Sequence, residues 1–475
     1  MILSLSFYFF YYISELLNRN ELIDVYLMFA QKEITKYIAD RPKSNALWER
    51  SINALAGGVS HNIRNLGLPL IGAFPPFIQK AEGSKVTDID GISYLDFWGA
   101  HYAMVTGYSN ETIQNKITHQ LSDGWHLGTV IEKQVLLAEL LIRDNPTIEN
   151  VRFCTSGTEA TMYATRLARA FTGKKKVAKA KFGWHGAADT LFYNVKAPLT
   201  GKETRGIVDE EKAGVISIDI NDPDVVLVLK EHSDELAAVI VEPVLGGGGG
   251  FPVDRDFLRL LREETEKDGI LLIFDEVITG YRFRYGLYQN EIGVQPDLTT
   301  MGKIIGGGFP IGAIGGRNDI IEQANPTLPD RVWVGGGTFS GYPLSMLAGL
   351  EMLSILKDSK NEYTRINKLG VHLLESLNDF FREEQLHFVA TGHKSLITLH
   401  PLTKFLDSQN PINIVANADK WKESLTQLAL LNRNVTGMHG IGALSFAHRK
   451  EDLHFAQQKI EEIAYPITKT NSNIK

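Results

Sequence analysis

The sequence feature that most constrains the fold is a short apolar run, Leu271–Phe274, that leads directly into Asp275 and Glu276. A continuous apolar run that carries charge only at its C-terminal end is typical of a parallel strand covered on both faces. Ligands of parallel sheets bind at the carboxyl ends of the strands. The run therefore predicts a buried strand of a parallel sheet, with Asp275 at the edge where a ligand would bind.

Similar runs alternate with helical patterns between about residue 100 and residue 345. We expect strands at Val151–Cys154, Ala238–Val241 and Leu271–Phe274, and helices at Glu159–Phe171 and Asp256–Asp268. Strands that alternate with helices form α/β folds with a parallel sheet. The central part of the chain is therefore predicted to be a large α/β domain.

The two ends of the chain predict a smaller domain. Gln31–Leu55 has helical periodicity, and Val86–Phe97 alternates around Asp90-Gly91 as a β-hairpin does. Near the C-terminus, Leu396–His400 and Ala443–Ala447 favour a small mixed sheet. We therefore divide the chain into an N-terminal extension with the first part of the small domain at residues 1–100, the large domain at 101–345, and the second part of the small domain at 346–475.

Composition limits the partners and the compartment. The net charge is −7, and acidic and basic residues are mixed along the chain, which argues against the basic patch of a nucleic-acid-binding protein. Cys154 is the only cysteine, so no disulfide can form within the chain and a cytoplasmic location is expected. Cys154 itself is more simply an apolar filler than a catalyst.

The first residues are unusually apolar and aromatic. Met1–Ile13 is followed by Glu15 and is shorter than the ~20 residues that a membrane span needs, so no membrane partner is expected. No positive segment precedes it and no small-residue cleavage site follows it, so a secretory signal is not indicated. The stretch is expected either to be an extension that packs on another subunit or to precede a true start at Met28.

Lys303 is the second residue with a clear chemical role, because it precedes the glycine run Gly306–Gly308. Pyridoxal 5′-phosphate enzymes need a lysine that forms a Schiff base with the cofactor aldehyde and an acid that pairs with the pyridine nitrogen. Burial would lower the pKa of Lys303, and the glycines would let the backbone approach the cofactor. Taken singly, Lys303 is more simply a surface charge and Asp275 a turn cap. The motifs that accompany them favour the catalytic interpretation.

Three further motifs supply groups that such a cofactor needs. Thr155–Ala160 follows a strand and begins a helix, and the free N–H groups and dipole of a helix start bind phosphate, although simple capping is the alternative. Trp184 lies between glycines and offers a flat face for stacking, unless it is a core tryptophan. Thr338, in Gly337–Gly341, could complete a phosphate site, and Glu242 ends a strand at the same edge of the sheet.

Six segments taken together resemble the class III pyridoxal-phosphate aminotransferases, and most closely the glutamate-1-semialdehyde aminomutase branch: Ser156–Ala160, Trp184–Gly186, Val241–Pro243, Phe274–Val277, Gly302–Gly308 and Gly337–Gly341. The likeness runs over roughly residues 50 to 460. It implies an α/β enzyme of fold type I, with a mostly parallel seven-stranded sheet in the large domain and a smaller α+β domain formed by both termini. It also implies a homodimer, or a higher homo-oligomer, with active sites between subunits.

The resemblance assigns roles to individual residues. It implies that Lys303 holds the internal aldimine and that Asp275 pairs with the pyridinium nitrogen. Val277 would pack under the ring and Trp184 would stack on its other face, where the branch usually has tyrosine. Thr338 would reach the phosphate from the neighbouring subunit. The full set of cofactor-binding residues implied in this way is Ser156, Gly157, Thr158, Trp184, His185, Glu242, Asp275, Val277, Lys303 and Thr338.

Two positions bear on the substrate and the reaction. Arg64, in a glycine-opened loop that should turn it inward, falls where the branch places an arginine for the substrate carboxylate, with His61 nearby. The aminomutase carries a serine at the position of His61 and a glutamate at the position of Gly440, and both help to hold its substrate. Their absence favours transamination from an amino acid or amine to a keto acid. Leu430–Val435 is also similar to aminotransferases that accept β-amino acids.

The alternative reaction is glutamate-1-semialdehyde 2,1-aminomutation, which returns the amino group to the same molecule and makes 5-aminolevulinate. A non-catalytic cofactor-binding or regulatory protein is disfavoured by the presence of Lys303 and Asp275. A nicotinamide enzyme is disfavoured because no Gly-x-Gly-x-x-Gly motif opens a helix after a strand. The sequence has no His-Glu-x-x-His motif, so a catalytic metal is not implied.

Overall fold

The structure, a computed structural model, describes residues 23–468 apart from 197, 198, 200, 202, 408, 409 and 439. The apolar start Met1–Ile13 lies outside the described residues, and so do both interpretations of it. Within the described residues, no helix is both long enough and apolar enough to cross a membrane.

The chain forms two compact units. Unit 1 comprises the described residues of Met1–Gly99, Gly107–Ser109 and Lys368–Lys475, and unit 2 comprises those of Ala100–Thr106 and Asn110–Asn367. Sequence patterns predict the second boundary at residue 345, whereas unit 2 continues to Asn367. The boundary falls later because α13 (Pro343–Lys357) packs on helices and a turn of unit 2. The start of α14 (Lys360–Glu383) is also bonded to unit 2, since Tyr363 Oη donates to the carbonyl of Tyr281 and Asn367 Nδ2 donates to the carbonyl of Phe283, each at 2.7 Å.

Unit 2 is built on a seven-stranded sheet with the order β4-β12-β11-β10-β7-β5-β6. The strands are β4 (Asn150–Cys154), β5 (Lys176–Ala180), β6 (Val215–Ile218), β7 (Leu236–Val241), β10 (Leu271–Asp275), β11 (Leu298–Gly302) and β12 (Gly312–Gly316). Only β12 is antiparallel to its neighbours. The predicted mostly parallel sheet is confirmed, and β7 and β10 are buried along their whole length.

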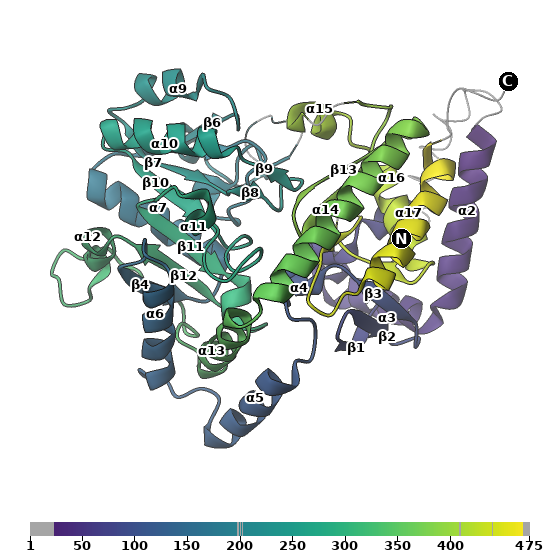
Figure 1. Ribbon diagram of the computed structural model, residues 1–475, viewed down its shortest axis with the longest axis horizontal. Helices are drawn as coiled ribbons and strands as arrows, with labels where there is room; N and C mark the ends of the chain where they lie inside the picture. The colour runs from purple at the N-terminus through teal and green to yellow at the C-terminus, as the bar shows by residue number, and fades with distance from the viewer. Residues whose placement is uncertain are drawn as a thin grey trace. The chain divides into compact units, whose positions relative to one another are not determined.

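Helices lie alongside this sheet, as Figure 1 shows for α7 and α10. The other elements with residues in unit 2 are α4 (Gly99–Tyr102), α5 (Glu111–Asp123), α6 (Glu132–Asp144), α7 (Gly157–Thr172), α8 (Asp209–Ala213), α9 (Val225–Glu231), α10 (Arg255–Lys267), α11 (Gln289–Ile292), α12 (Asn318–Ile321), β8 (Val244–Leu245) and β9 (Phe251–Pro252). Helix α7 begins where the Ser156 hydroxyl accepts a hydrogen bond from the Glu159 N–H and ends at the left-handed Gly173, as the capping rules predict. Its buried face, with Ala164 and Leu167 fully covered, packs against the strands of the core.

Unit 1 contains helices and two small sheets from both ends of the chain (Figure 1). Its elements are α2 (Ile23–Asp40), α3 (Pro42–Ala54), β1 (Ile78–Glu82), β2 (Lys85–Asp88), β3 (Ser93–Asp96), most of α14 (Lys360–Glu383), β13 (Phe388–His393), β14 (Leu396–Pro401), α15 (Pro411–Ala416), α16 (Lys420–Leu431), β15 (Val435–Thr436), β16 (Gly442–Ala443) and α17 (Lys450–Thr468). The predicted hairpin at Val86–Phe97 is present as β2 and β3.

The C-terminal sheet differs from the prediction. The β13-β14-β16 sheet is wholly antiparallel, and the mixed sheet is β1-β2-β3-β15, in which β15 runs parallel to β3. The strand expected over Ala443–Ala447 ends at Ala443. The chain turns there because the backbone N–H of Ser445 donates a hydrogen bond of 2.9 Å to His448 Nδ1.

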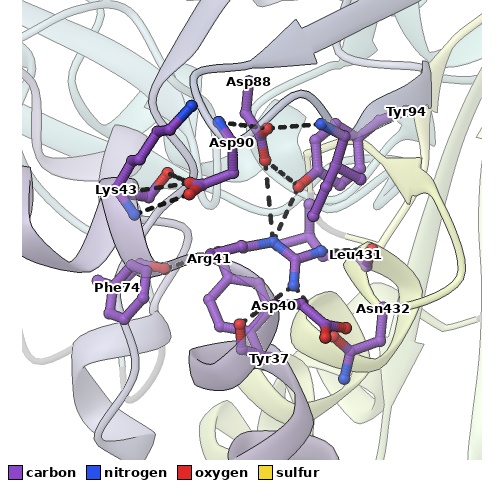
Figure 2. A network of polar contacts seen from close by, with 12 residues as sticks. Tyr37, Asp40, Arg41, Lys43, Phe74, Asp88, Asp90, Tyr94, Leu431 and Asn432 are labelled. Atoms are coloured by element: carbon purple, nitrogen blue, oxygen red, sulfur yellow. Dashed lines mark hydrogen bonds and ion pairs between the residues drawn. The ribbon is translucent and has the colours of Figure 1, made fainter.

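The helix expected over Gln31–Leu55 breaks at Arg41, immediately before Pro42, which cannot continue the backbone hydrogen bonds of a helix. Arg41 is buried and lies over the Tyr37 ring, with the guanidinium carbon 4.0 Å from the ring centre. Its Nε donates to Tyr94 Oη at 2.9 Å, and its Nη2 donates to the carbonyl of Leu431 at 3.0 Å (Figure 2).

The same cluster contains a buried carboxylate. Asp88 Oδ2 accepts a hydrogen bond from Tyr94 Oη and lies 3.9 Å from Arg41 Nε (Figure 2). Breaking such a buried pair leaves an uncompensated charge and costs about 3–5 kcal/mol. The cluster therefore joins the end of α2, the β2–β3 hairpin and the end of α16 into one body.

Candidate active site

The carboxyl edge of the seven-stranded sheet surrounds a cavity of about 170 Å³ within unit 2. The residues that line it are Ser156, Gly157, Thr158, Trp184, His185, Gly186, Glu242, Asp275, Val277, Ile278, Lys303 and Ile311. The structure thus brings together all the residues predicted to bind the cofactor, except Thr338. Sheet topology explains this, because the turns after parallel strands meet at one edge.

Asp275 ends β10 and is only 4% exposed. Its carboxylate accepts hydrogen bonds from Thr300 Oγ1 at 3.0 Å and from the Val277 N–H at 3.1 Å, and it contacts His185 Nδ1 at 2.8 Å. Three partners on three different segments fix both carboxylate oxygens. Asp275 is therefore a preorganised negative charge at the cavity wall, suited to hold a proton on a ring nitrogen.

His185 orients this carboxylate from the cavity wall. Its Nδ1 faces Asp275, so the neutral ring carries its proton on Nδ1 and donates it to the carboxylate. Burial lowers the pKa of His185, while Asp275 opposes that shift. The Thr161 hydroxyl donates to the carbonyl of His185 at 2.6 Å, which anchors the segment to α7.

Glu242 follows β7 and forms the next part of the wall. It accepts hydrogen bonds from the Trp184 N–H at 2.8 Å and from the Gly246 N–H at 3.1 Å. Burial, reinforced by the negative charge of Asp275, raises the pKa of Glu242 to about 8. Glu242 therefore fixes the backbone of Trp184, whose side chain lines the cavity.

Lys303 follows β11 and begins the short turn η5 (Lys303–Gly306). Its φ of 48° lies in the left-handed region, which is uncommon for a residue with a side chain and is often found at functional sites. Burial lowers the pKa of Lys303, although Asp275 and Glu242 oppose the shift. The environment therefore favours the neutral amine, which is the nucleophilic form.

The start of α7 also lines the cavity. Glycine is required there by close packing, because a Cβ on Gly157 would lie 2.9 Å from Val277 Cγ1. Gly186 has a φ of 81°, and a Cβ on it would lie 2.7 Å from Thr158 Cα. The first residues of α7 thus line the same cavity as Asp275, and a helix start together with a carboxylate fits a phosphorylated ring with a basic nitrogen.

The glycine run after Lys303 has a different role from the predicted one. Gly306, Gly307 and Gly308 do not line the cavity. Gly307 has a φ of 57°, and a Cβ on it would lie 2.6 Å from the carbonyl carbon of Ala348 in α13. The run allows η5 to pack tightly on α13 rather than bringing backbone into the cavity.

The remaining predicted residues lie elsewhere. Thr338 is exposed and does not line the cavity, and its contribution from a neighbouring subunit stays a prediction. Arg64 and His61 belong to unit 1, at the short turn η2 (Asn62–Asn65), and both side chains are exposed. Their roles as substrate-binding residues stay a prediction. His61 Nδ1 accepts a hydrogen bond of 3.4 Å from the Ile63 N–H and caps this turn.

Sequence reasoning missed two residues beside the site. Thr300 holds Asp275, and the register of β10 with β11, which pairs these two residues, would have revealed it. Lys179 is fully buried near Glu242, and the sequence carried no signal for it, because it stands in the lysine-rich stretch Lys174–Lys181. In the described part of the chain, no group of His, Cys, Asp and Glu side chains is placed to hold a metal ion.

Comparison with known proteins identifies similar chains. The family model "Aminotransferase class-III" matches residues 72–391. A glutamate-1-semialdehyde 2,1-aminomutase of Methanothrix thermoacetophila is 39% identical over 362 residues, which are 74% of this chain and 80% of that protein. The enzyme of the same name from Persephonella marina is 41% identical over 75% of this chain and 83% of its own. Among solved structures, an omega-transaminase from Sphaerobacter thermophilus is 30% identical with a TM-score of 0.79, over 90% of this chain and 98% of that one.

Proposed function

Because this chain belongs to the class III aminotransferases, a family of pyridoxal 5′-phosphate enzymes, we propose that it moves amino groups at the cavity described above, with Lys303 as the residue that attaches to the cofactor. The observation that carries the proposal is the meeting of Lys303, Asp275 and the start of α7 in one cavity.

The lining residues would hold the cofactor as follows. Ser156, Gly157 and Thr158 would bind the phosphate at the start of α7, and Asp275 would face the pyridine nitrogen. Val277 and Trp184 would lie against the ring. When bound, the cofactor supplies an electron sink for the charge that develops on the substrate carbon.

The chain's own residues would carry the proton transfers. The neutral Nζ of Lys303 would accept the proton from the substrate carbon and pass it to the cofactor, as a general base and acid. Asp275, held by His185 and Thr300, would keep the ring nitrogen protonated throughout. Glu242 would hold Trp184 in place.

The comparisons support the aminomutase reaction better than the intermolecular transamination that the sequence favours. Both relatives described above are named glutamate-1-semialdehyde 2,1-aminomutase, and they match most of the length of each chain. On this ground the first candidate is transfer of the amino group within glutamate-1-semialdehyde.

A specific observation supports transamination as the second candidate. Gly440 stands where the aminomutase branch carries a glutamate, and its φ is 87°. A Cβ at Gly440 would lie 2.6 Å from Leu399 Cβ, so the backbone leaves no room for a side chain there. Together with His61 in place of a serine, this argues against the aminomutase substrate site.

One assay separates the two reactions. The holoenzyme is given glutamate-1-semialdehyde alone, without a keto acid, and 5-aminolevulinate is measured. Rapid formation supports the aminomutase. Slow formation, with turnover of α-, β- or ω-amines in the presence of pyruvate or 2-oxoglutarate, supports the transaminase. Absence of both activities in a protein that carries the cofactor contradicts the proposed function.

An exposed apolar surface in unit 2 supports a homodimer. Trp125, Val130 and Phe339 are 59%, 78% and 53% exposed. The rings of Phe339 and His126 are 5.2 Å apart, so part of this surface is contiguous. Exposed apolar clusters are typical of interaction sites. A second copy of the chain would cover this surface and could bring Thr338 to a neighbouring site.

We propose the cytoplasm as the compartment of this protein, on the basis of its single cysteine.

A further inference from the structure

We propose that Lys179 is a positioning residue for the cavity: its ammonium group holds the Tyr193 segment that supports Trp184, and it places a positive charge beside Glu242. This inference rests on the proposed function, because it concerns the wall against which the cofactor would lie. Lys179 does not line the cavity itself.

Lys179 is a lysine in an unusual place. It lies in β5, between Ile240 of β7 and Ser217 of β6, and it is 0% exposed. Lysine side chains normally extend to water, and a buried ammonium is costly unless its charge and donors are satisfied. A fully buried lysine therefore indicates that nearby acceptors and negative charges satisfy its ammonium group.

The hydrogen bonds of Lys179 tie two segments together. Its Nζ donates to the carbonyl of Ala180 at 3.0 Å and to the carbonyl of Tyr193 at 2.8 Å. The Phe182 N–H donates to the carbonyl of Asn194 at 2.8 Å, in the same region. Lys179 therefore anchors the chain around Tyr193 beside the end of β5.

The anchored segment supports Trp184. The Phe192 ring meets the Trp184 ring edge-on, with the ring centres 5.7 Å apart and the planes at 84°. Phe192 precedes Tyr193, so loss of the Lys179 bond would release one support of Trp184. A second support is the hydrogen bond from the Trp184 N–H to Glu242.

The positive charge of Lys179 also acts on Glu242, in the wall of the cavity. Glu242 faces Asp275, Lys303 and Lys179, which belong to β10, to the turn after β11 and to β5. When Lys303 is neutral, Lys179 is the cation of this group that remains to offset the carboxylates. Burial lowers the pKa of Lys179 to about 8, and Glu242 and Glu203 oppose the shift, while Lys179 in turn lowers the pKa of His185. Removing Lys179 should therefore make Glu242 and His185 bind protons more readily.

The test uses Lys179→Met in the holoenzyme, with Lys181→Met as the matched control. Lys181 lies two residues away, half-buried, and its Nζ pairs with Asp219 at 2.6 Å outside the cavity. We expect Lys179→Met to weaken the visible circular dichroism of the bound cofactor. We also expect it to raise the pH midpoint of the cofactor absorbance by on the order of half a unit, because a nearby positive charge is lost. The control should change neither property.

The double variant Lys179→Met with Glu242→Gln separates charge from packing. If Lys179 offsets the charge of Glu242, Lys179→Met should raise the pH midpoint of the cofactor absorbance less in a Glu242→Gln background than in the wild-type background. Should Lys179→Met not fold, Lys179→Gln keeps an N–H donor without the charge and should still raise the midpoint. A wild-type circular dichroism spectrum and midpoint in the folded Lys179 variant would overturn the inference. Failure of the wild-type protein to bind the cofactor would instead contradict the proposed function.

Discussion

At the scale of single residues, the site depends on burial acting against charge. Lys303 and Glu242 are both shifted by burial toward their neutral forms, and Asp275 opposes the shift at the lysine while reinforcing it at the glutamate. A neutral amine beside a fixed carboxylate is what nucleophilic and proton-transfer chemistry requires.

Replacing Lys303 tests its covalent role. Lys303→Ala should abolish the borohydride-reducible chromophore and reduce turnover to background, because no other amine lines the cavity among the described residues. The measurement is visible absorbance before and after borohydride, together with activity. Lys181→Ala is the control and should leave both unchanged. Wild-type turnover in Lys303→Ala would refute the assignment.

The raised pKa of Glu242 predicts a pH dependence of stability. Burial raises the pKa of its carboxyl group to about 8 in the folded chain, against 4.5 as the ordinary value. Between these values the folded state binds more protons than the unfolded state, so the free energy of unfolding falls as pH rises through this window. In the cofactor-free protein, Tm should decline less steeply from pH 5 to pH 8 in Glu242→Gln than in the wild type. If Tm declines equally steeply in both proteins, the pKa of Glu242 is not raised as proposed.

We propose, from the resemblance to the aminomutase branch, that Arg64, which is exposed in unit 1, binds the substrate carboxylate. Arg64→Ala should raise KM for carboxylated amines by the loss of a charge-assisted bond worth on the order of 1.5–3 kcal/mol, and it should spare amines without a carboxylate. Steady-state kinetics with one amine of each kind decides the matter. An equal loss for both kinds would remove Arg64 from this role.

At the scale of elements, local patterns predicted what local physics determines. Strands β7 and β10 could be predicted because burial on both faces requires a continuous apolar run. The start of α7 could be predicted because a serine caps it. The function of Gly307 was not identifiable, since it depends on α13, which arrives about forty residues later. Thr300 and Lys179 needed the strand register for the same reason.

The packing of η5 on α13 predicts the effect of substituting Gly307. Gly307→Ala meets both a left-handed φ and the Ala348 backbone, whereas Gly173→Ala meets a left-handed φ of 71° with nothing within 4 Å. We expect Gly173→Ala to cost about 1–2 kcal/mol, and Gly307→Ala to cost roughly 1–3 kcal/mol more. Denaturant unfolding measures both. Equal losses would mean that the Ala348 contact relaxes freely.

At the scale of the whole molecule, the exposed aromatic surface and the proposed position of Thr338 point to the same requirement for a second copy. Thr338 immediately precedes Phe339, which is half exposed. A cofactor site completed between subunits would make cofactor retention depend on assembly.

Light scattering and cofactor retention together test this dependence. The wild type should be at least a dimer, and Phe339→Asp should shift it toward monomer and release cofactor on gel filtration. Leu227→Asp, at another exposed apolar position on α9, is the control and should do neither. A stable monomer with full cofactor occupancy would exclude a site shared between subunits.

The cluster around Arg41 has a consequence for biosynthesis. Its partner carbonyl, that of Leu431, is separated from it by 390 positions, and β15 joins β3 in the β1-β2-β3-β15 sheet although it lies near the other end of the chain. During translation, Arg41 and Asp88 leave the ribosome long before Leu431 does. Domains generally fold as units in the order of synthesis. Unit 2 can therefore acquire its sheet on the nascent chain, whereas the N-terminal part of unit 1 must wait, incomplete and open to chaperones, until the last helices emerge.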